Sequence, residues 1–346
     1  MLGNRIFKAA SAVFLMLSGA TMAAIPAAAA MQYPYGLGVD QNTGALYVAD
    51  PSSGVFVFNP VSSALSSFVA APNAFSIAVD NNGLIYAGIV GADGHINVYD
   101  ANHKAINSLP VPPGDSPITM VLDADNILYQ SNGHSATPVP GGQSSTEINA
   151  YNNDLTLPYN NANFVAMFPA YRKLQTYTDL APGTKYALAY DNGRVFVVAK
   201  RDGAFIYNVY EAPNLLSGQA VDIFNRTFTA ANSLSPDYGA AVVTNHNINV
   251  IGSAFATAAD ANHNIFYTDP DGRNITVAAK GRAAKALLTN LPSSPYGIAF
   301  DKSRARLYVS FPSEHLIRAY KVTYATQNGV SVPAISSTPL GIIQQR

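Results

Sequence analysis

The sequence contains no cysteine and no tryptophan among its 346 residues, and charged residues make up only 12% of it. Without cysteine the chain can form no disulfide, thiolate zinc site, iron–sulfur cluster or cysteine nucleophile. The charge is also balanced, because 20 Lys and Arg stand against 21 Asp and Glu and give a net charge of −1. A protein that grips a polyanion carries an excess of positive charge, so the sequence predicts no nucleic-acid partner.

Apolar residues, in contrast, make up 48% of the chain, and it holds 20 Tyr and 16 Phe. A chain of this length and apolar content can bury a large core. Its low charge is also the opposite of what a disordered chain shows.

Residues 1–30 have the pattern of a secretory signal peptide. Arg5 and Lys8 give a positive start, residues 9–17 are apolar, and Ala28-Ala29-Ala30 fits the small-residue cleavage pattern. We expect cleavage after Ala30 and a secreted or periplasmic mature chain. The alternative, an uncleaved membrane anchor, would need an apolar run of about 20 residues. No later segment is long enough either, so no membrane span is expected after cleavage.

One unit recurs about six times along the rest of the chain. Each copy has a short apolar run that ends in Asp, a turn of Asn and Gly, a second run with an aromatic residue, and an alternating third run. The first runs are Tyr35–Asp40, Phe75–Asp80, Ile118–Asp123, Tyr186–Asp191, Phe255–Asp260 and Tyr296–Asp301. A step of about 40 residues with three or four strands is the length of a propeller blade. The sequence therefore predicts an all-β, six-bladed β-propeller of four-stranded antiparallel sheets, formed by residues 31–346 as one domain.

Two of the steps between these copies are longer than the others. The segment near residues 152–182 has the composition of a long loop or an elongated outer strand. Residues 211–251 contain either an extra hairpin or a degenerate seventh blade anchored at Asp222. Both segments are treated as insertions in the six-bladed fold, and seven blades is the alternative.

Bulky and small residues alternate in the first strand of each unit. In the last unit Tyr296, Ile298 and Phe300 alternate with Gly297 and Ala299. Successive side chains of a strand point to opposite faces, so each innermost strand has a thick face and a thin face. In a radial arrangement the thick face of one sheet fits the thin face of the next, where the sheets approach most closely. The alternation thus predicts a closed ring.

The segments Pro34–Asp40 with Leu46–Asp50, and Ser294–Asp301 with Arg306–Ser310, resemble NHL-type and SMP-30/gluconolactonase-like β-propellers. The resemblance covers nearly all of residues 33–322 and implies the propeller fold. In the lactonase branch it also implies a divalent cation at the channel mouth, held by Glu, Asn and Asp residues. That branch usually opens with a Glu-Gly-Pro-x-Trp-like motif, whereas this first strand begins Tyr33-Pro34-Tyr35.

Hydrophilic residues that follow the second strands are expected to ring one rim of the channel, where loops from several blades converge. These binding candidates, with one histidine from a long loop, are Asp50, Asn132, His134, Lys200, Asp269 and Ser310. Asp50, Asn132 and Asp269 have the oxygen ligands that a hard cation requires. Alternatively, Asp50 and Asp269, each followed by proline, begin turns through side-chain-to-backbone hydrogen bonds. For His134 and Lys200 the alternatives are a solvated loop and a plain hairpin tip.

No nucleophile elbow, phosphate loop or dinucleotide fingerprint occurs in the sequence. We therefore predict an exported binding protein, a monomer without a cofactor, that holds a protein, a cell-wall component or a small molecule on one rim. The alternative is a lactonase-like hydrolase that uses a divalent cation, Ca²⁺ or Zn²⁺, at the channel mouth. A third possibility is a purely structural surface scaffold.

Overall fold

The computed structural model describes residues 30–92, 94–111, 116–122, 126, 128–131, 148–151, 186–191, 194–201, 204–211, 255–279 and 284–345. In these residues the regular structure is almost entirely β-strand, with one 3₁₀ turn, η3 (Pro312–Glu314). The described part of the chain contains no helix of the length and apolar character needed to cross a bilayer.

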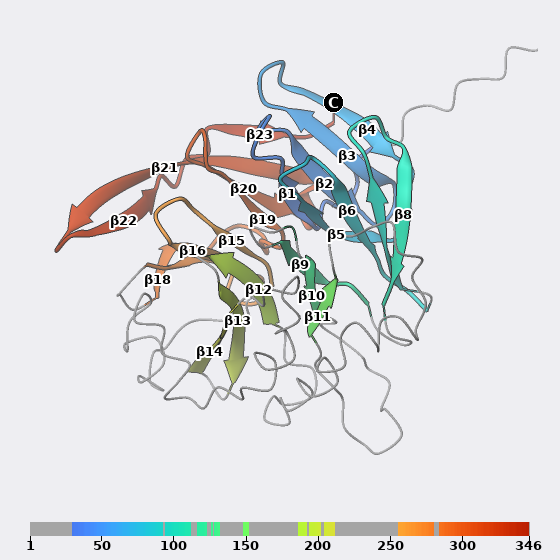
Figure 1. The fold of residues 1–346 in the computed structure, drawn as a ribbon. Helices are drawn as coiled ribbons and strands as arrows, with labels where there is room; N and C mark the ends of the chain where they lie inside the picture. Colours follow the sequence, from blue (N-terminus) through green and yellow to red (C-terminus); the bar gives the residue numbers. More distant parts are fainter. Residues whose placement is uncertain are drawn as a thin grey trace, which may run out of the picture.

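Within these ranges the strands form six antiparallel sheets, in which consecutive strands pair, except that β23 pairs with β21 (Figure 1). The first two sheets contain β1 (Leu37–Val39), β2 (Leu46–Asp50), β3 (Gly54–Asn59) and β4 (Ala64–Val69), then β5 (Ala74–Val79), β6 (Ile85–Ile89), β7 (His95–Tyr99) and β8 (Ala105–Pro110). The next two contain β9 (Thr119–Leu122), β10 (Leu128–Ser131) and β11 (Ile148–Tyr151), then β12 (Tyr186–Asp191), β13 (Arg194–Arg201) and β14 (Ala204–Glu211). The last two contain β15 (Thr257–Ala259), β16 (Ile265–Asp269), β17 (Asn274–Ala278) and β18 (Lys285–Leu288), then β19 (Ile298–Asp301), β20 (Arg306–Phe311), β21 (Leu316–Gln327), β22 (Val330–Ile335) and β23 (Gly341–Ile343).

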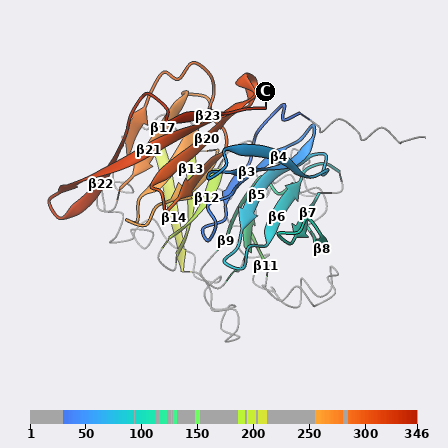
Figure 2. The same ribbon diagram turned by 90° about the horizontal axis from the view of Figure 1, so that it is seen from above.

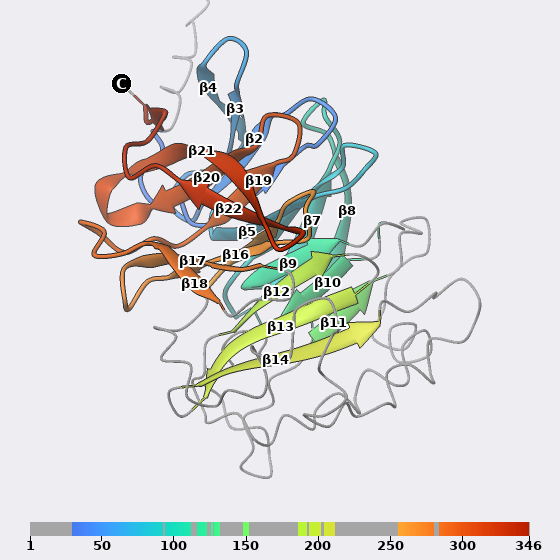
Figure 3. The same ribbon diagram turned by 90° about the vertical axis from the view of Figure 1, so that its left-hand side faces the viewer.

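The first strands of the sheets contact one another in a closed cycle. The order around the cycle is β1, β5, β9, β12, β15, β19 and back to β1. Figure 1 shows these strands near the centre of the molecule and β8, β14 and β18 farther out, and Figure 3 shows β9–β11 beside β12–β14. A closed ring of radial antiparallel sheets is a β-propeller, so the predicted fold class is confirmed.

The number of blades stays a prediction. The cycle has six members among the described residues. The insertion predicted at residues 152–182, and the segment 211–251 beyond Glu211 with the alternative anchor Asp222, lie outside the residues that the structure describes.

The thick and thin faces of the first strands pack as the alternation predicts. Ile298 and Phe300 of β19 belong to the core shared with the preceding sheet, where the rings of Phe300 and Phe266 stack with centroids 5.5 Å apart. Ala299, on the opposite face, packs into the core shared with the first sheet. The hydrophobic core is therefore a series of sheet-to-sheet interfaces around the axis.

The thin face leaves no room for a side chain at its tightest points. A Cβ atom placed on Gly297 would lie 1.9 Å from the carbonyl oxygen of Tyr35, and one on Gly36 would lie 2.5 Å from that of Phe75. Carbonyl groups of the next blade thus occupy the space that any larger residue needs.

In four of the described sheets the repeated Asp holds the turn between the first and second strands. The Oδ1 atom of Asp80 accepts the backbone N–H groups of Asn82 and Leu84, both at 2.8 Å. Further buried anchors that hold their own turns through the carboxylate are Asp40, Asp260 and Asp301. Such bonds stabilise a tight turn without help from the rest of the fold.

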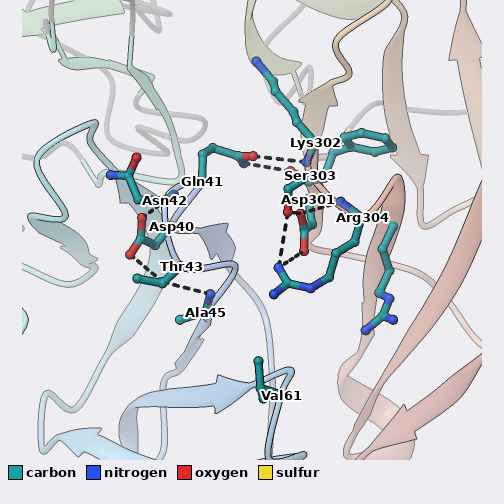
Figure 4. A network of polar contacts seen from close by, with 12 residues as sticks. Asp40, Gln41, Asn42, Thr43, Ala45, Val61, Asp301, Lys302, Ser303 and Arg304 are labelled. Carbon is teal, nitrogen blue, oxygen red and sulfur yellow. Dashed lines mark hydrogen bonds and ion pairs between the residues drawn. The ribbon is translucent and has the colours of Figure 1, made fainter.

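Side chains also link these turns from blade to blade. Gln41 donates from Nε2 to the carbonyl oxygen of Phe300 at 2.8 Å, and its Oε1 accepts the backbone N–H of Lys302 at 3.1 Å (Figure 4). Asn42 donates to the carbonyl oxygen of Asn81 at 2.9 Å. The first and last sheets share no strand, so contacts of this kind close the ring.

The C-terminal region departs from the repeat. β21 is long, and it pairs with β23 through residues 317–319 and with β22 through residues 322–327. The outer half of β21 and β22 form a ribbon that extends away from the sheets (Figures 1 and 2). At its base the Tyr324 hydroxyl donates to Asp260 at 2.9 Å. The sequence repeat ends near residue 322 and did not predict this ribbon.

The close approach of the first strands predicts a large effect of one added methyl group. Gly297→Ala places a Cβ against the Tyr35 carbonyl, and we expect a loss of about 3 kcal/mol in the free energy of unfolding. Gly341→Ala is the matched control, because no atom lies within 4 Å of a Cβ at that position. Urea unfolding monitored by circular dichroism measures both variants, and equal stabilities would contradict the ring packing.

Candidate binding site at one mouth of the channel

One mouth of the channel contains the beginnings of the first strands and the ends of the second strands. The two strands run antiparallel, and Tyr35 just before β1 donates its backbone N–H to Ala49 near the end of β2, at 2.9 Å. Tyr296 makes the equivalent bond to Ser310 at 3.0 Å. The turns held by the repeated Asp lie at the opposite mouth. Asp50, Asp269 and Ser310 therefore lie at the same mouth.

Asp50 is fully buried, and its carboxylate is occupied by backbone donors. Its Oδ2 accepts the N–H groups of Gln32 and Tyr33 at 2.5 and 2.6 Å. Its Oδ1 accepts those of Ser52 and Ser53 at 2.9 and 3.2 Å. A carboxylate has about four acceptor positions, and here all four are used. Asp50 therefore does not fit the role of a cation ligand, and its contacts favour the turn role.

Asp269 is also fully buried. Its Oδ1 accepts the backbone N–H of Gly272 at 2.9 Å, and its Oδ2 lies 3.4 Å from the Nδ2 atom of Asn274. These contacts hold the turn between β16 and β17 and leave acceptor capacity on Oδ2. A binding role for Asp269 stays a prediction.

Ser310 and Thr268 occupy equivalent places in β20 and β16, and each bonds to the next blade. The Ser310 hydroxyl donates to the carbonyl oxygen of Tyr35 at 2.9 Å and accepts the N–H of Gly297 at 2.7 Å. The Thr268 hydroxyl donates to the carbonyl oxygen of Tyr296 at 2.5 Å. Both hydroxyls thus fix the backbone of an aromatic residue at the mouth.

The remaining candidates give less information. Lys200 lies in β13, where its backbone pairs with Phe205 of β14. Asn132 and His134 lie outside the described residues, so their predicted roles stay predictions. Within the described ranges, no three His, Asp or Glu side chains gather as they would around a metal ion.

Four aromatic side chains meet at this mouth. Tyr35 stacks on Phe75 with ring centroids 4.6 Å apart and meets Tyr296 edge-on at 5.1 Å. Phe255 contacts Tyr296 at 4.9 Å and Phe75 at 5.9 Å, which completes a cycle. We call these four residues the aromatic floor.

The aromatic floor crosses the channel. Phe75 lies in β5 of the second sheet, and Phe255 lies just before β15 of the fifth sheet. β5 and β15 are not neighbours in the ring. Their contact therefore joins opposite sides of the channel at this level. All four side chains are only half-buried, so the floor also presents ring surface to a ligand.

Tyrosine hydroxyl groups gather beside the floor. Burial raises the pKa of Tyr35, and the nearby phenol groups of Tyr296 and Tyr33 raise it further, since neighbouring phenolates would repel each other. Tyr33 is 42% exposed and meets the ring of His315 edge-on at 5.4 Å. With a raised pKa, the Tyr35 hydroxyl stays protonated at neutral pH and acts as a hydrogen-bond donor or acceptor.

Charge beside the floor is largely compensated. Glu314 of η3 forms an ion pair with Arg318 of β21 at 2.5 Å, and it also contacts the hydroxyl of Ser293. His315 follows η3 in a left-handed conformation with φ of 58°, and its Nδ1 contacts the carbonyl oxygen of Gln32. The mouth therefore combines aromatic surface and hydroxyl groups, with its nearest described ion pair internally balanced.

The alternation of large and small residues placed Tyr296 on the thick face of its strand, and the sequence alone did not identify the floor. The sequence did contain a signal for the floor. Each of the four units that contribute a ring has an aromatic residue five positions before its repeated Asp. What the sequence does not show is that these positions face one another across the channel.

Backbone N–H groups occupy all the acceptor positions of the Asp50 carboxylate. A substitution at Asp50 therefore separates a role in holding the turn from a role in binding a metal ion. Asp50→Ala removes the carboxylate to which four backbone N–H groups donate, although the N–H of Ser53 also donates to the carbonyl oxygen of residue 50 at 3.2 Å and keeps that acceptor. We expect the substitution to lower the free energy of unfolding by about 3 kcal/mol, even in EDTA. Asp100→Ala is the control, since that half-buried carboxylate holds an outer turn through Asn102 and Lys104. We expect it to cost about 1 kcal/mol.

Thermal unfolding with and without added Ca²⁺, Mn²⁺ or Zn²⁺ completes the test of Asp50. We expect the wild-type melting temperature to be unchanged by these ions. Stabilisation by one of them that Asp50→Ala abolishes would contradict the turn role.

No protein-family model matches the sequence, and no curated protein matches it either. Several solved structures share the fold. A protein of unknown function from Bacteroides thetaiotaomicron aligns with a TM-score of 0.53 at 10% identity, over 85% of this chain and 70% of that chain. A PQQ-bound aldose sugar dehydrogenase from Streptomyces coelicolor aligns with a TM-score of 0.51 at 13% identity, over 89% and 96%. A protein assigned as a gluconolactonase aligns with a TM-score of 0.50 at 13% identity, over 82% and 87%. These likenesses confirm, at the level of the fold, the resemblance to gluconolactonase-like and other β-propellers.

Proposed function

We propose that the chain is an exported, monomeric binding protein that holds a neutral, hydroxyl-bearing ligand with a flat apolar face, such as a sugar ring, on the aromatic floor. The observation that carries this proposal is the cycle of Tyr35, Phe75, Phe255 and Tyr296, which closes across the channel while all four residues stay only half-buried. Small-molecule sites typically combine aromatic surface with a few placed polar groups.

The chemistry of the mouth supports a neutral ligand. The hydroxyl groups of Tyr33 and Tyr296 lie close enough to that of Tyr35 to help raise its pKa. Each is both a donor and an acceptor, which suits the hydroxyl groups of a polyol. An anionic or cationic ligand would need an unpaired charge of opposite sign, whereas Glu314 and Arg318 pair with each other.

The same geometry supports binding without a chemical step. A general base must be able to take up a proton near the operating pH. The Tyr35 pKa is raised away from neutrality, and both oxygens of Asp50 are occupied by backbone donors. The lactonase-like hydrolase has no comparable supporting contact among the described residues.

Titration with methyl β-glucoside, cellobiose, maltose and chitobiose tests the proposal. Tyrosine emission can report binding directly, because the chain has no Trp. Since stacking supplies the affinity, Tyr296→Ala is expected to weaken binding about tenfold. Tyr35→Phe keeps the ring and loses one hydroxyl, so we expect a loss of about fivefold.

The control variant is Tyr324→Phe, which removes a hydroxyl group that bonds to Asp260 at the opposite mouth. It should bind the sugars as the wild type does. Failure of every sugar to bind, or wild-type affinity in Tyr296→Ala, would contradict a role for the aromatic floor.

Export generates a separate prediction, that the mature chain begins at Met31. Met31 is buried, and its backbone nitrogen donates to the Oε1 atom of Gln345 at 2.6 Å, whereas Ala30 is exposed. Cleavage after Ala30 would preserve that bond, since an α-amino group is also a donor. Expression of the full-length chain in a Gram-negative host, followed by N-terminal sequencing of the periplasmic fraction, checks this prediction. A full-length chain retained in the cytoplasm would overturn it.

A further inference from the structure

A groove runs between the first and last sheets, toward the mouth opposite the aromatic floor. It has a volume of about 1180 Å³. One wall is formed by residues of β3, β4 and the turn between them, and the other by β20, β21 and residues 338–345, which include β23. Arg306 lies in the groove directly after the turn anchored by Asp301, which places the groove at the opposite mouth.

Exposed apolar side chains gather at this groove. Leu340 and Ile342, which line it, are 57% and 54% exposed, and Val61 in the adjoining turn is 81% exposed. These are three of the five large apolar side chains that the described part of the chain leaves exposed. Phe58 and Leu65 line the facing wall. Exposed apolar side chains that gather in one place indicate a contact site.

Arg306 is the one charged residue among the described residues that line the groove. Its Nη1 atom lies 3.4 Å from the Tyr308 hydroxyl, and its Nε is buried with no hydrogen-bond partner. The neighbouring carboxylate of Asp301 pairs instead with Arg304, at 2.9 Å (Figure 4). No described carboxylate lies within ion-pair distance of Arg306. A partly buried guanidinium without an anion favours binding one.

The wall that carries the apolar side chains is fixed in place. Three residues of β23 pair with β21, and the side chain of Gln345 accepts the backbone N–H of Met31. The groove is therefore formed before a ligand arrives, and binding does not have to order the C-terminal segment. A preformed site loses less conformational entropy when it binds.

We propose that this groove binds an aliphatic carboxylate, with the carboxylate on Arg306 and the alkyl chain along Leu340, Ile342 and the facing apolar wall. The guanidinium fork matches the two oxygens of a carboxylate. One unpaired cation, without a second Arg or a Lys among the lining residues that the structure describes, suits a single negative charge better than a phosphate dianion. The apolar walls of the groove can contact an alkyl chain, so they favour a carboxylate with a long chain over a small carboxylate.

Isothermal titration calorimetry of the whole mature protein, from Met31 onward, tests this proposal. The titrant is octanoate below its critical micelle concentration. Acetate keeps the charge and loses the chain, whereas 1-octanol keeps the chain and loses the charge. We expect octanoate to bind at least about tenfold more tightly than either probe.

Two variants localise the binding. Arg306→Gln is expected to weaken octanoate binding about tenfold, and Leu340→Ser about fivefold. The matched control is Lys302→Gln, since the exposed side chain of Lys302 does not line the groove and only its backbone takes part in the bond to Gln41. Circular dichroism melts verify that each variant folds, and Leu340→Ser keeps the site testable if Arg306→Gln does not fold.

Octanoate affinity that falls in Arg306→Gln and Leu340→Ser but not in Lys302→Gln supports the proposal. Wild-type affinity in Arg306→Gln, equal affinity for octanoate and 1-octanol, or no binding of octanoate would overturn it. A dimer in size-exclusion chromatography that Leu340→Ser dissociates would also overturn it, because a second copy of the chain would then cover the groove. Sugar binding at the aromatic floor is expected to be unchanged in Arg306→Gln, so the two sites fail or succeed independently.

Discussion

The distance between neighbouring first strands at the axis constrains everything else in this molecule. The carbonyl oxygen of Tyr35 lies where a Cβ of residue 297 would stand, so only glycine lets the last sheet approach the first so closely. The residue before each such glycine is aromatic, Tyr296 before Gly297 and Tyr35 before Gly36. The close approach therefore brings their rings to 5.1 Å from each other at the mouth. The glycines of the repeat are therefore as necessary for the aromatic floor as the aromatic residues themselves.

Closure of the ring has a second consequence, on the outside of the molecule. The first and last sheets come from opposite ends of the described chain and share no strand, so side-chain bonds such as those of Gln41 and Ser310 hold them together. These bonds lie close to the axis. Farther out, β3 and β4 face the C-terminal segment across a groove that no strand fills. Sheets that radiate from one centre are closest at the axis and separate toward the outside of the molecule. This separation leaves the groove open.

The features that the sequence predicted are local in the chain. Asp80 bonds to N–H groups two and four residues ahead, and the alternation of Phe300 with Ala299 shows within one strand. Period, turn chemistry and alternation were therefore enough to predict a closed ring of antiparallel sheets. No partner from another blade is needed to recognise any of them.

The features that the sequence did not predict depend on distant partners. The Oδ2 atom of Asp50, which its own turn does not use, is occupied by Gln32 and Tyr33, which precede it by 18 and 17 residues in a segment that has no counterpart in the repeat. The contact between Phe75 and Phe255 depends on the width of the channel, which no single unit encodes. The groove depends on β23, beyond the end of the repeat. The sequence thus placed Asp50 and Ser310 at one mouth of the channel, but their side chains bond to the backbone there.

The roles of those residues explain why the aromatic floor is suited to recognition. Thr268 and Ser310 bind the carbonyl groups of Tyr296 and Tyr35, so the backbone beneath two of the four rings is fixed by hydroxyl groups of the preceding blade. A binding surface on strand ends with such support holds its geometry better than one on loops. A ligand that stacks on these rings therefore meets a surface whose spacing is set by the blades themselves. Thr268 and Ser310 therefore shape the mouth through the rings that they position, which a search for polar contact residues alone does not reveal.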